Sequence, residues 1–311
     1  MPFNPLDRRA ALAMTTTTAT ALPSLRVKRS NPAASNPPHL ARLACVLLLV
    51  FSAQAEFVSQ AWAAQTELAT QSQVIQKWSA PDKTPSSVFK SAKKDLVNFG
   101  DATTTPDFWH SMLLVGGISL VSAVADKPLD RYALNHGQSG IMRDVKNVGN
   151  VLPFAAIAYS ATMFLASDPD SKPARTAYSS LAAGGLGAMT ALGLKYMVGR
   201  ARPSAEQGSA SFTPVNIHNG DTSWPSMHTT VMWAVITPYA KAYDAPWLYG
   251  VAAVTNASRV IGRDHWFSDT VASSLLGYAI GNFIWTSHQG EQGGAQWLIT
   301  PNRVAVNWKF D

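Results

Sequence analysis

Three clusters in the chain combine cationic side chains with two histidines, and these residue types can together bind a phosphate group. In the first cluster, Lys195 and Arg202 lie seven residues apart at the end of an apolar stretch, so they share one face while a helix lasts. Pro203 disfavours helical geometry for the residue before it, so Arg202 is expected in the following loop. The cluster then presents two cations at a helix end, although the same pair would also suit snorkelling interfacial side chains.

The second cluster, Ser223 to Thr229, precedes an apolar run and contains Ser226, Met227 and His228. Ser226 is a favourable N-cap, and the unpaired N–H groups at a helix start can hold the oxygens of an anion. His228 is expected in the first turn, facing whatever is bound there. By itself, a capping serine with a nearby histidine is also a common structural arrangement.

The third cluster contains Arg259, His265 and Asp269. If a helix begins near His265, one turn brings the Asp269 carboxylate to the imidazole, where it would fix the tautomer and the ring orientation. Arg259 adds a planar guanidinium suited to phosphate oxygens. A histidine and an aspartate four residues apart are also a frequent structural pair.

The three clusters follow the spacings Lys-x6-Arg-Pro, Pro-Ser-x-His and Ser-Arg-x5-His-x3-Asp in this order. With them the sequence resembles the type-2 phosphatidic acid phosphatase superfamily, which includes vanadium haloperoxidases and bacterial non-specific acid phosphatases. The resemblance covers about residues 107–286. One position departs from the family pattern, because Met227 stands where the family has glycine.

This resemblance implies a role for each residue of the clusters. His265 would attack phosphorus to form a phosphohistidine, Asp269 would orient it, and His228 would protonate the leaving oxygen and then activate water. The resemblance implies no metal and no cofactor, because positive side chains can take the place of a metal around the phosphoryl oxygens. The groups expected to hold these oxygens are Lys195, Arg202, Ser226, the backbone at Met227, and Arg259.

The elements that must position these residues are helices. Alanine-, leucine- and glycine-rich runs without strand-like alternation occupy residues 109–125, 148–166, 177–198, 229–240, 247–257 and 266–285. They predict an all-α fold, a helical bundle of about six core helices. The alternation of Val304, Val306, Trp308 and Phe310 after a Thr-Pro-Asn turn predicts a small C-terminal β-hairpin.

Four segments are expected along the chain. Residues 1–55 have the positive, apolar, small-x-small order of a secretory signal peptide, with an extended n-region and the only cysteine, Cys45, inside the leader. An alternative cleavage site ends at Ala63, and an uncleaved anchor is the alternative to cleavage. Residues 56–106 are polar with one amphipathic stretch, residues 107–286 form the phosphatase bundle, and residues 287–311 form the hairpin tail. The amphipathic stretch, which contains Val88, Ala92, Leu96 and Phe99, is interpreted as a helix docked on the core rather than on lipid.

The charge distribution argues against nucleic-acid binding. The net charge is +6, but residues 1–55 hold six basic residues against one acid, so the rest of the chain is close to neutral. The expected partners are a phosphorylated small molecule or lipid and a membrane surface. The interval between His228 and Ser258 is too short for two bilayer spans, so we expect an exported protein that is periplasmic, or peripheral or shallow at the periplasmic face of the inner membrane, with an integral form as the alternative.

The expected function is a metal-independent phosphatase acting on phosphomonoesters or diphosphates, with lipid-linked ones as candidates. Two alternatives stay open. One is a vanadate-dependent haloperoxidase, because its pocket uses the same residue types. The other is a catalytically impaired envelope protein, for which Met227 is the one supporting feature.

Overall fold

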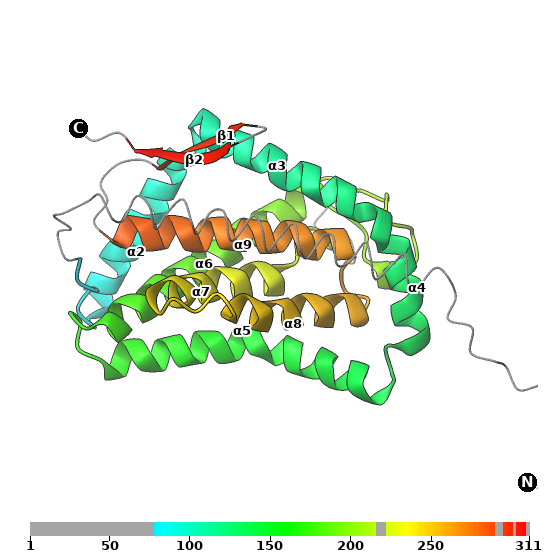
Figure 1. Cartoon of the computed structure of the whole chain (residues 1–311), viewed down its shortest axis with the longest axis horizontal. Helices are drawn as coiled ribbons and strands as arrows, with labels where there is room; N and C mark the ends of the chain where they lie inside the picture. Colours follow the sequence, from blue (N-terminus) through cyan, green and yellow to red (C-terminus); the bar gives the residue numbers. More distant parts are fainter. Residues whose placement is uncertain (1–77, 216–221, 290–294, 301–302, 309–311) are drawn as a thin grey trace, which may run out of the picture.

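The computed structural model describes residues 78–215, 222–289, 295–300 and 303–308. The signal peptide and its cleavage sites were predicted within residues 1–63, which lie outside these ranges. The helices are α2 (Pro85–Thr103), α3 (Pro106–Ser122), α4 (Asp126–His136), α5 (Gly140–Ala166), α6 (Lys172–Val198), α7 (Met227–Ala242), α8 (Leu248–Ile261) and α9 (Phe267–His288) (Figure 1). The six apolar runs correspond to α3 and to α5 through α9, so the prediction of an all-α bundle is confirmed.

Two further helices, α2 and α4, lie outside the six apolar runs. The amphipathic stretch forms α2, and its Val88 and Phe99 pack against the core as expected, whereas Leu96 is exposed. Helix α4 was not predicted, because its sequence is polar and carries no long apolar run. Its Leu129 packs against the core, its Ala133 is buried, and its Asp126 and Asp130 form ion pairs with arginines from other parts of the chain.

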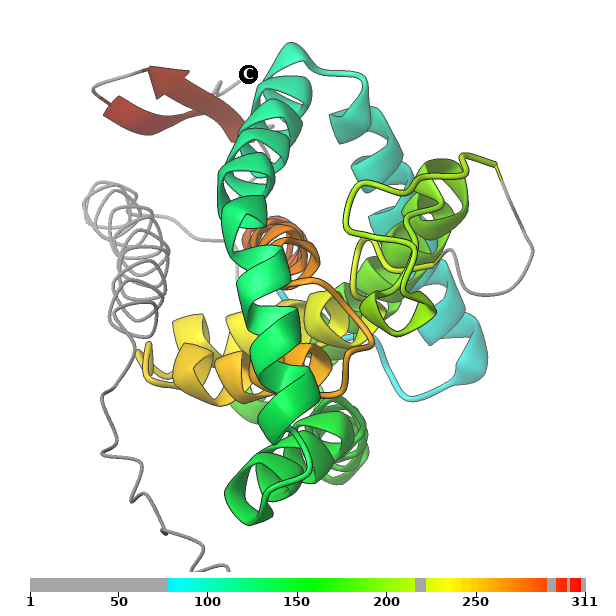
Figure 2. The same ribbon diagram turned by 90° about the vertical axis from the view of Figure 1, so that its right-hand side faces the viewer.

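Helices α7 and α9 form the centre of the bundle. Nearly every residue of both is buried, and neither has a distinct polar face, which is the pattern of a helix surrounded by other helices. Helices α5, α6 and α8 pack against α7, while α3 and α6 pack against α9. Figure 2, in which α9 is seen nearly end-on, shows the other helices arranged around it.

Small residues let these central helices touch backbone to backbone. A Cβ added at Gly277 of α9 would lie 2.4 Å from the Thr230 carbonyl oxygen of α7, and one at Gly281 would lie 2.7 Å from that of Ala234. Glycine is required at both positions for this approach. The first turns of α7 and α9, which carry the site residues, are therefore held at a fixed spacing.

The outer helices present apolar side chains outward. Three helical stretches are long and apolar enough to cross a membrane, namely Pro106–His136, Gly140–Ala166 and Lys172–Val198. The large exposed apolar side chains on them include Leu113, Leu120, Ile141, Phe154, Leu165 and Met197. By contrast, α7 and α8 have 16 and 14 residues and are about 24 and 21 Å long at 1.5 Å per residue.

The strands β1 (Ala295–Thr300) and β2 (Arg303–Trp308) follow the bundle. They pair antiparallel with Ala295 opposite Trp308 and Thr300 opposite Arg303. This pairing forms a two-stranded sheet, and β1 lies against α3.

Candidate active site

His265 lies in the turn before α9 with its ring buried. Its Nδ1 is within hydrogen-bonding distance of the Ser223 carbonyl oxygen. A carbonyl only accepts, so Nδ1 must carry the proton and Nε2 keeps a free lone pair. The sequence thus orients this imidazole with a backbone group, and the ring is prepared for a reaction at Nε2.

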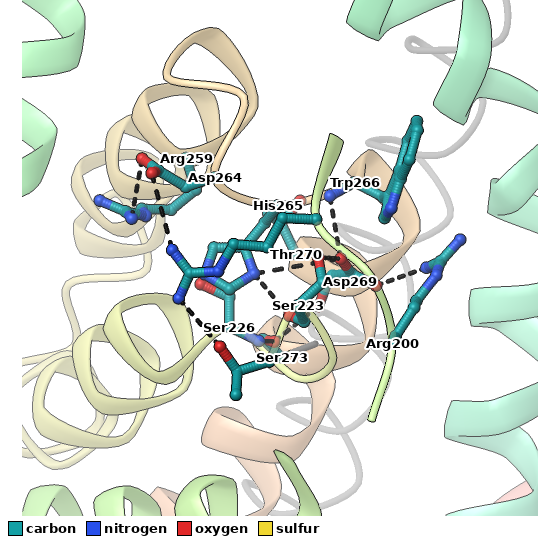
Figure 3. Close-up of polar contacts among 12 residues, drawn as sticks. Arg200, Ser223, Ser226, Arg259, Asp264, His265, Trp266, Asp269, Thr270 and Ser273 are labelled. Atoms are coloured by element: carbon teal, nitrogen blue, oxygen red, sulfur yellow. Dashed lines mark hydrogen bonds and ion pairs between the residues drawn. The ribbon is translucent and has the colours of Figure 1, made fainter. Parts of the chain in front are cut away.

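Asp269 lies beside this histidine but does not hydrogen-bond to it. The spacing predicted a direct contact, yet α9 begins only at Phe267, and Asp269 Oδ2 is 4.0 Å from His265 Nδ1. Ser223 connects the two, because its hydroxyl donates to Asp269 Oδ2 while its carbonyl accepts from the imidazole (Figure 3). The expected direct hydrogen bond is therefore replaced by a contact through Ser223.

A buried ion network fixes Asp269 in turn. Arg200 Nη1 contacts Asp269 Oδ1, and Arg200 Nη2 donates to Asp126 Oδ2 at 2.7 Å. Asp126 Oδ1 also accepts from the Ser268 backbone N–H at 2.8 Å. The other donors of the guanidinium reach the Ser209 carbonyl oxygen at 3.0 and 2.7 Å and the Ser268 hydroxyl at 2.8 Å. Since removing one partner from a buried ion pair leaves an uncompensated charge, this network constrains the first turn of α9.

Lys195 and Arg202 both hydrogen-bond to Thr222, although they do not belong to one continuous helix. Helix α6 ends at Val198, and Gly199 caps it with a left-handed φ of 60°. A Cβ at Gly199 would also collide with a backbone carbonyl, so glycine is required there. The backbone of Arg202 is extended, as expected for the residue before Pro203. Lys195 Nζ then donates to the Thr222 carbonyl, and Arg202 Nη2 donates to the Thr222 hydroxyl at 3.2 Å.

Arg259, near the end of α8, is the third cation. Its Nη2 lies 2.8 Å from Asp264 Oδ2, and its Nη1 donates to the Asn150 side-chain oxygen of α5. Arg202 Nη1 approaches the other oxygen of Asp264 at 3.9 Å. Both arginines thus face one carboxylate.

The N-terminus of α7 supplies the second histidine. Ser226 caps the helix as predicted, because its hydroxyl accepts from Thr229 N at 3.4 Å. Met227 and His228 are the first residues of α7. The backbone N–H groups in this first turn have no carbonyl partner within the helix. The His228 ring meets the ring of Phe154 on α5 edge-on, with centroids 5.5 Å apart.

The electrostatics place both histidines beside the same cations. Burial lowers the pKa of His265 well below its usual value, and Lys195, Arg259 and Arg202 lower it further. Burial likewise lowers the pKa of His228 to about 4, with Arg259 as the strongest of the same three cations. Both rings are therefore neutral near pH 7. The structure thus brings together both predicted histidines, the three cations and, through Ser223, Asp269.

Sequence reasoning missed several residues of the site. Arg200 and Asp264 lie inside the first and third clusters, so their charge could have marked them. Asp126 and Asn150 lie far away in the sequence and carried no such signal. Their involvement depends on where α3, α4 and α5 pack.

Comparison with known proteins agrees with this geometry. The family model of the PAP2 superfamily matches residues 176–292. A lipid A 1-phosphatase of Porphyromonas gingivalis is 32% identical over 93 residues, which are 28% of this chain and 18% of that protein. The chain thus spans less than a fifth of the length of this relative. No solved structure is significantly similar to the chain. Both histidines and all three cations lie inside residues 176–292, the part of the chain that is similar to the PAP2 superfamily.

Proposed function

We propose that this protein is a metal-independent phosphatase that hydrolyses a lipid-linked phosphomonoester or diphosphate through a phosphohistidine on His265. The observation that carries the proposal is the orientation of His265. Its Nδ1 is tied to the Ser223 carbonyl, and its unprotonated Nε2 is left beside three cations. An imidazole held in this way is a nucleophile aimed at a bound phosphoryl group.

The reaction has two steps. In the first, His265 Nε2 forms a bond to phosphorus as the bond to the leaving oxygen breaks, and His228 gives its proton to that oxygen. In the second, His228 takes a proton from water, whose oxygen attacks phosphorus and breaks the N–P bond. Inorganic phosphate and free His265 are the products, and His228 is protonated again.

His228 must be protonated for the first step, although its pKa without substrate is about 4. A phosphoryl group bound at the cations brings negative charge close to the ring, and a nearby negative charge raises a histidine pKa. Substrate binding therefore raises the pKa of His228, so that the ring carries the proton that it gives to the leaving oxygen. The three cations stabilise the charge on the equatorial oxygens during transfer.

A lipid substrate is supported by the surroundings of the site. The relative from P. gingivalis is named for a phosphatase acting on lipid A. Helix α5 presents Phe154, which is 62% exposed, beside His228, and its outer face is apolar. An apolar chain can lie along this face while its phosphate reaches the histidines. The signal-peptide pattern supports a site at the periplasmic face of the inner membrane.

The covalent intermediate gives the first test. Rapid quench with substrate carrying labelled phosphate should give protein-bound label that is acid-labile and base-stable. His265→Ala should abolish the label, whereas His110→Ala should retain it, because the His110 side chain is 64% exposed on α3. Label that persists at the wild-type level in His265→Ala would overturn the assignment.

Membrane association gives the second test. The apolar outer faces of α3, α5 and α6 favour the integral form over the peripheral or shallow one expected from the short α7 and α8. After carbonate washing of membranes, the protein should stay in the pellet and enter solution only with detergent. Release by carbonate alone would support the peripheral form.

A further inference from the structure

Asp264 presents its two carboxylate oxygens to two different phosphate-binding arginines. Oδ2 lies 2.8 Å from Arg259 Nη2, and Oδ1 lies 3.9 Å from Arg202 Nη1. Arg259 is largely buried, whereas the Asp264 side chain is 30% exposed and borders solvent. The oxygens of a bound phosphoryl group require these same two guanidinium groups.

The other partners of these arginines are neutral. Arg259 Nη1 donates to the Asn150 side-chain oxygen, and Arg202 Nη2 donates to the Thr222 hydroxyl. Within the described residues, Asp264 is the one carboxylate that forms ion pairs with either arginine. Removal of its charge therefore changes the charge of the anion site without removing the other hydrogen bonds.

The turn before His265 holds Asp264 in this position. Its backbone N–H donates to the Arg259 carbonyl oxygen at 3.1 Å, and that of His265 donates to the same oxygen at 3.3 Å. Arg263 has a left-handed φ of 55° and is bound by Asp130, with Nε to Oδ1 at 2.7 Å and Nη2 to Oδ2 at 3.2 Å. The carboxylate is thus placed by a constrained turn rather than by a freely moving loop.

Gly262 leaves the space that the carboxylate occupies. A Cβ at this position would lie 2.6 Å from Asp264 Oδ2. Its φ of −71° suits any residue, so the backbone conformation alone does not require glycine. Glycine at position 262 therefore serves to leave room for the Asp264 carboxylate beside Arg259.

We propose that the Asp264 carboxylate occupies the anion site, competes with the phosphoryl group for Arg202 and Arg259, and so lowers the affinity of the site for phosphate ligands. An internal competitor weakens the binding of every phosphate ligand by the same factor. Inorganic phosphate and small esters have few other contacts, so they bind poorly, and the product phosphate leaves readily. A substrate with a large apolar part recovers affinity through contacts elsewhere. This inference rests on the proposed function and states that a ligand binds tightly only when it makes further contacts outside the anion site.

The test measures binding of inorganic phosphate and orthovanadate to the full-length protein in detergent, with no turnover required. Asp264→Asn keeps the size of the side chain and one acceptor oxygen but removes the charge. It should bind both anions about five- to tenfold more tightly than wild type, as expected for one partly solvated charge a few ångströms away. Asp170→Asn removes an exposed carboxylate at the opposite end of α6 and should bind like wild type.

A second variant moves the carboxylate without removing it. Gly262→Ala displaces Asp264 from Arg259 and should also tighten anion binding, by less than Asp264→Asn. Equal or weaker binding in Asp264→Asn, with normal binding in wild type, would overturn the inference and make Asp264 a positioning group for the arginines. Failure of both wild type and Asp264→Asn to bind orthovanadate would instead overturn the proposed function.

Discussion

Arg200 Nη2 donates to Asp126 Oδ2 at 2.7 Å, and this bond joins the α3–α4 junction to the loop that follows α6. The same guanidinium contacts Asp269 at the start of α9. Both carboxylates are completely buried. Three segments distant in sequence thus meet at one cation behind the His265 ring.

Replacing Arg200 with methionine should therefore destabilise the protein strongly. The change leaves Asp126 and Asp269 buried without their shared cation, and loss of one partner from a buried ion pair costs about 3–5 kcal/mol. Denaturant unfolding in detergent measures the loss. Arg143→Met removes an exposed arginine from α5 and is the matched control, which should change little. An equal stability for the two variants would show that the network contributes nothing to folding.

The depressed pKa of His228 predicts a stability that depends on pH. The folded pKa is about 4 and the unfolded value is near 6.5, so between these values the unfolded chain binds more protons. The free energy of unfolding should therefore fall as the pH falls from about 6.5 to 4. His228→Gln should flatten part of this dependence, while His110→Gln should not. Thermal unfolding of the substrate-free protein across this range is the measurement, and identical slopes for His228→Gln and wild type would contradict the pKa shift.

Met227 should be tolerated in place of the glycine of the family pattern. Met227 is the first residue of α7. It is not among the described non-glycine residues with positive φ, so no backbone strain is expected there. Met227→Gly should keep the rate with p-nitrophenyl phosphate within about an order of magnitude, a barrier change near 1.4 kcal/mol. The preference between lipid and small substrates should shift. A gain of several orders of magnitude on every substrate would show that methionine impairs the wild-type site.

Hydrolysis should survive chelation and be inhibited by vanadate. The proposed charge stabilisation comes from Lys195, Arg202 and Arg259, and vanadate mimics the trigonal-bipyramidal phosphoryl group. Initial rates with and without EDTA test the first point, and inhibition constants test the second. Loss of activity with EDTA that magnesium or zinc restores would indicate a metal-dependent mechanism instead.

The sequence predicted the helices well because their signals are local. Thr84, Thr105 and Ser171 each cap a helix that has proline in its first turn, and the apolar runs define the helix interiors. Helix α4 lacked such a signal. Its first residue, Asp126, is buried, and the partners that compensate its charge, Arg200 and Ser268, come from elsewhere in the fold.

The sequence indicated which residues gather at the site but not which partners each side chain binds. The spacing of the clusters pointed to both histidines and all three cations, and the structure places these cations close enough to act on both rings. The spacing did not identify what each side chain binds. Asp269 was expected to hold His265 directly, whereas the loop containing Ser223 enters between them. Such a contact depends on where a loop packs, which no local pattern specifies.

The close approach of α7 and α9 at Gly277 and Gly281 also decides how ligands reach the histidines. Helices that touch backbone to backbone cannot separate without losing the packing of the whole centre, so the site does not open between them. On the side of α5, Phe154 is exposed beside His228. If the chain is the proposed phosphatase, a lipid substrate would approach His228 from the side of α5, with its tail along the apolar outer face of that helix.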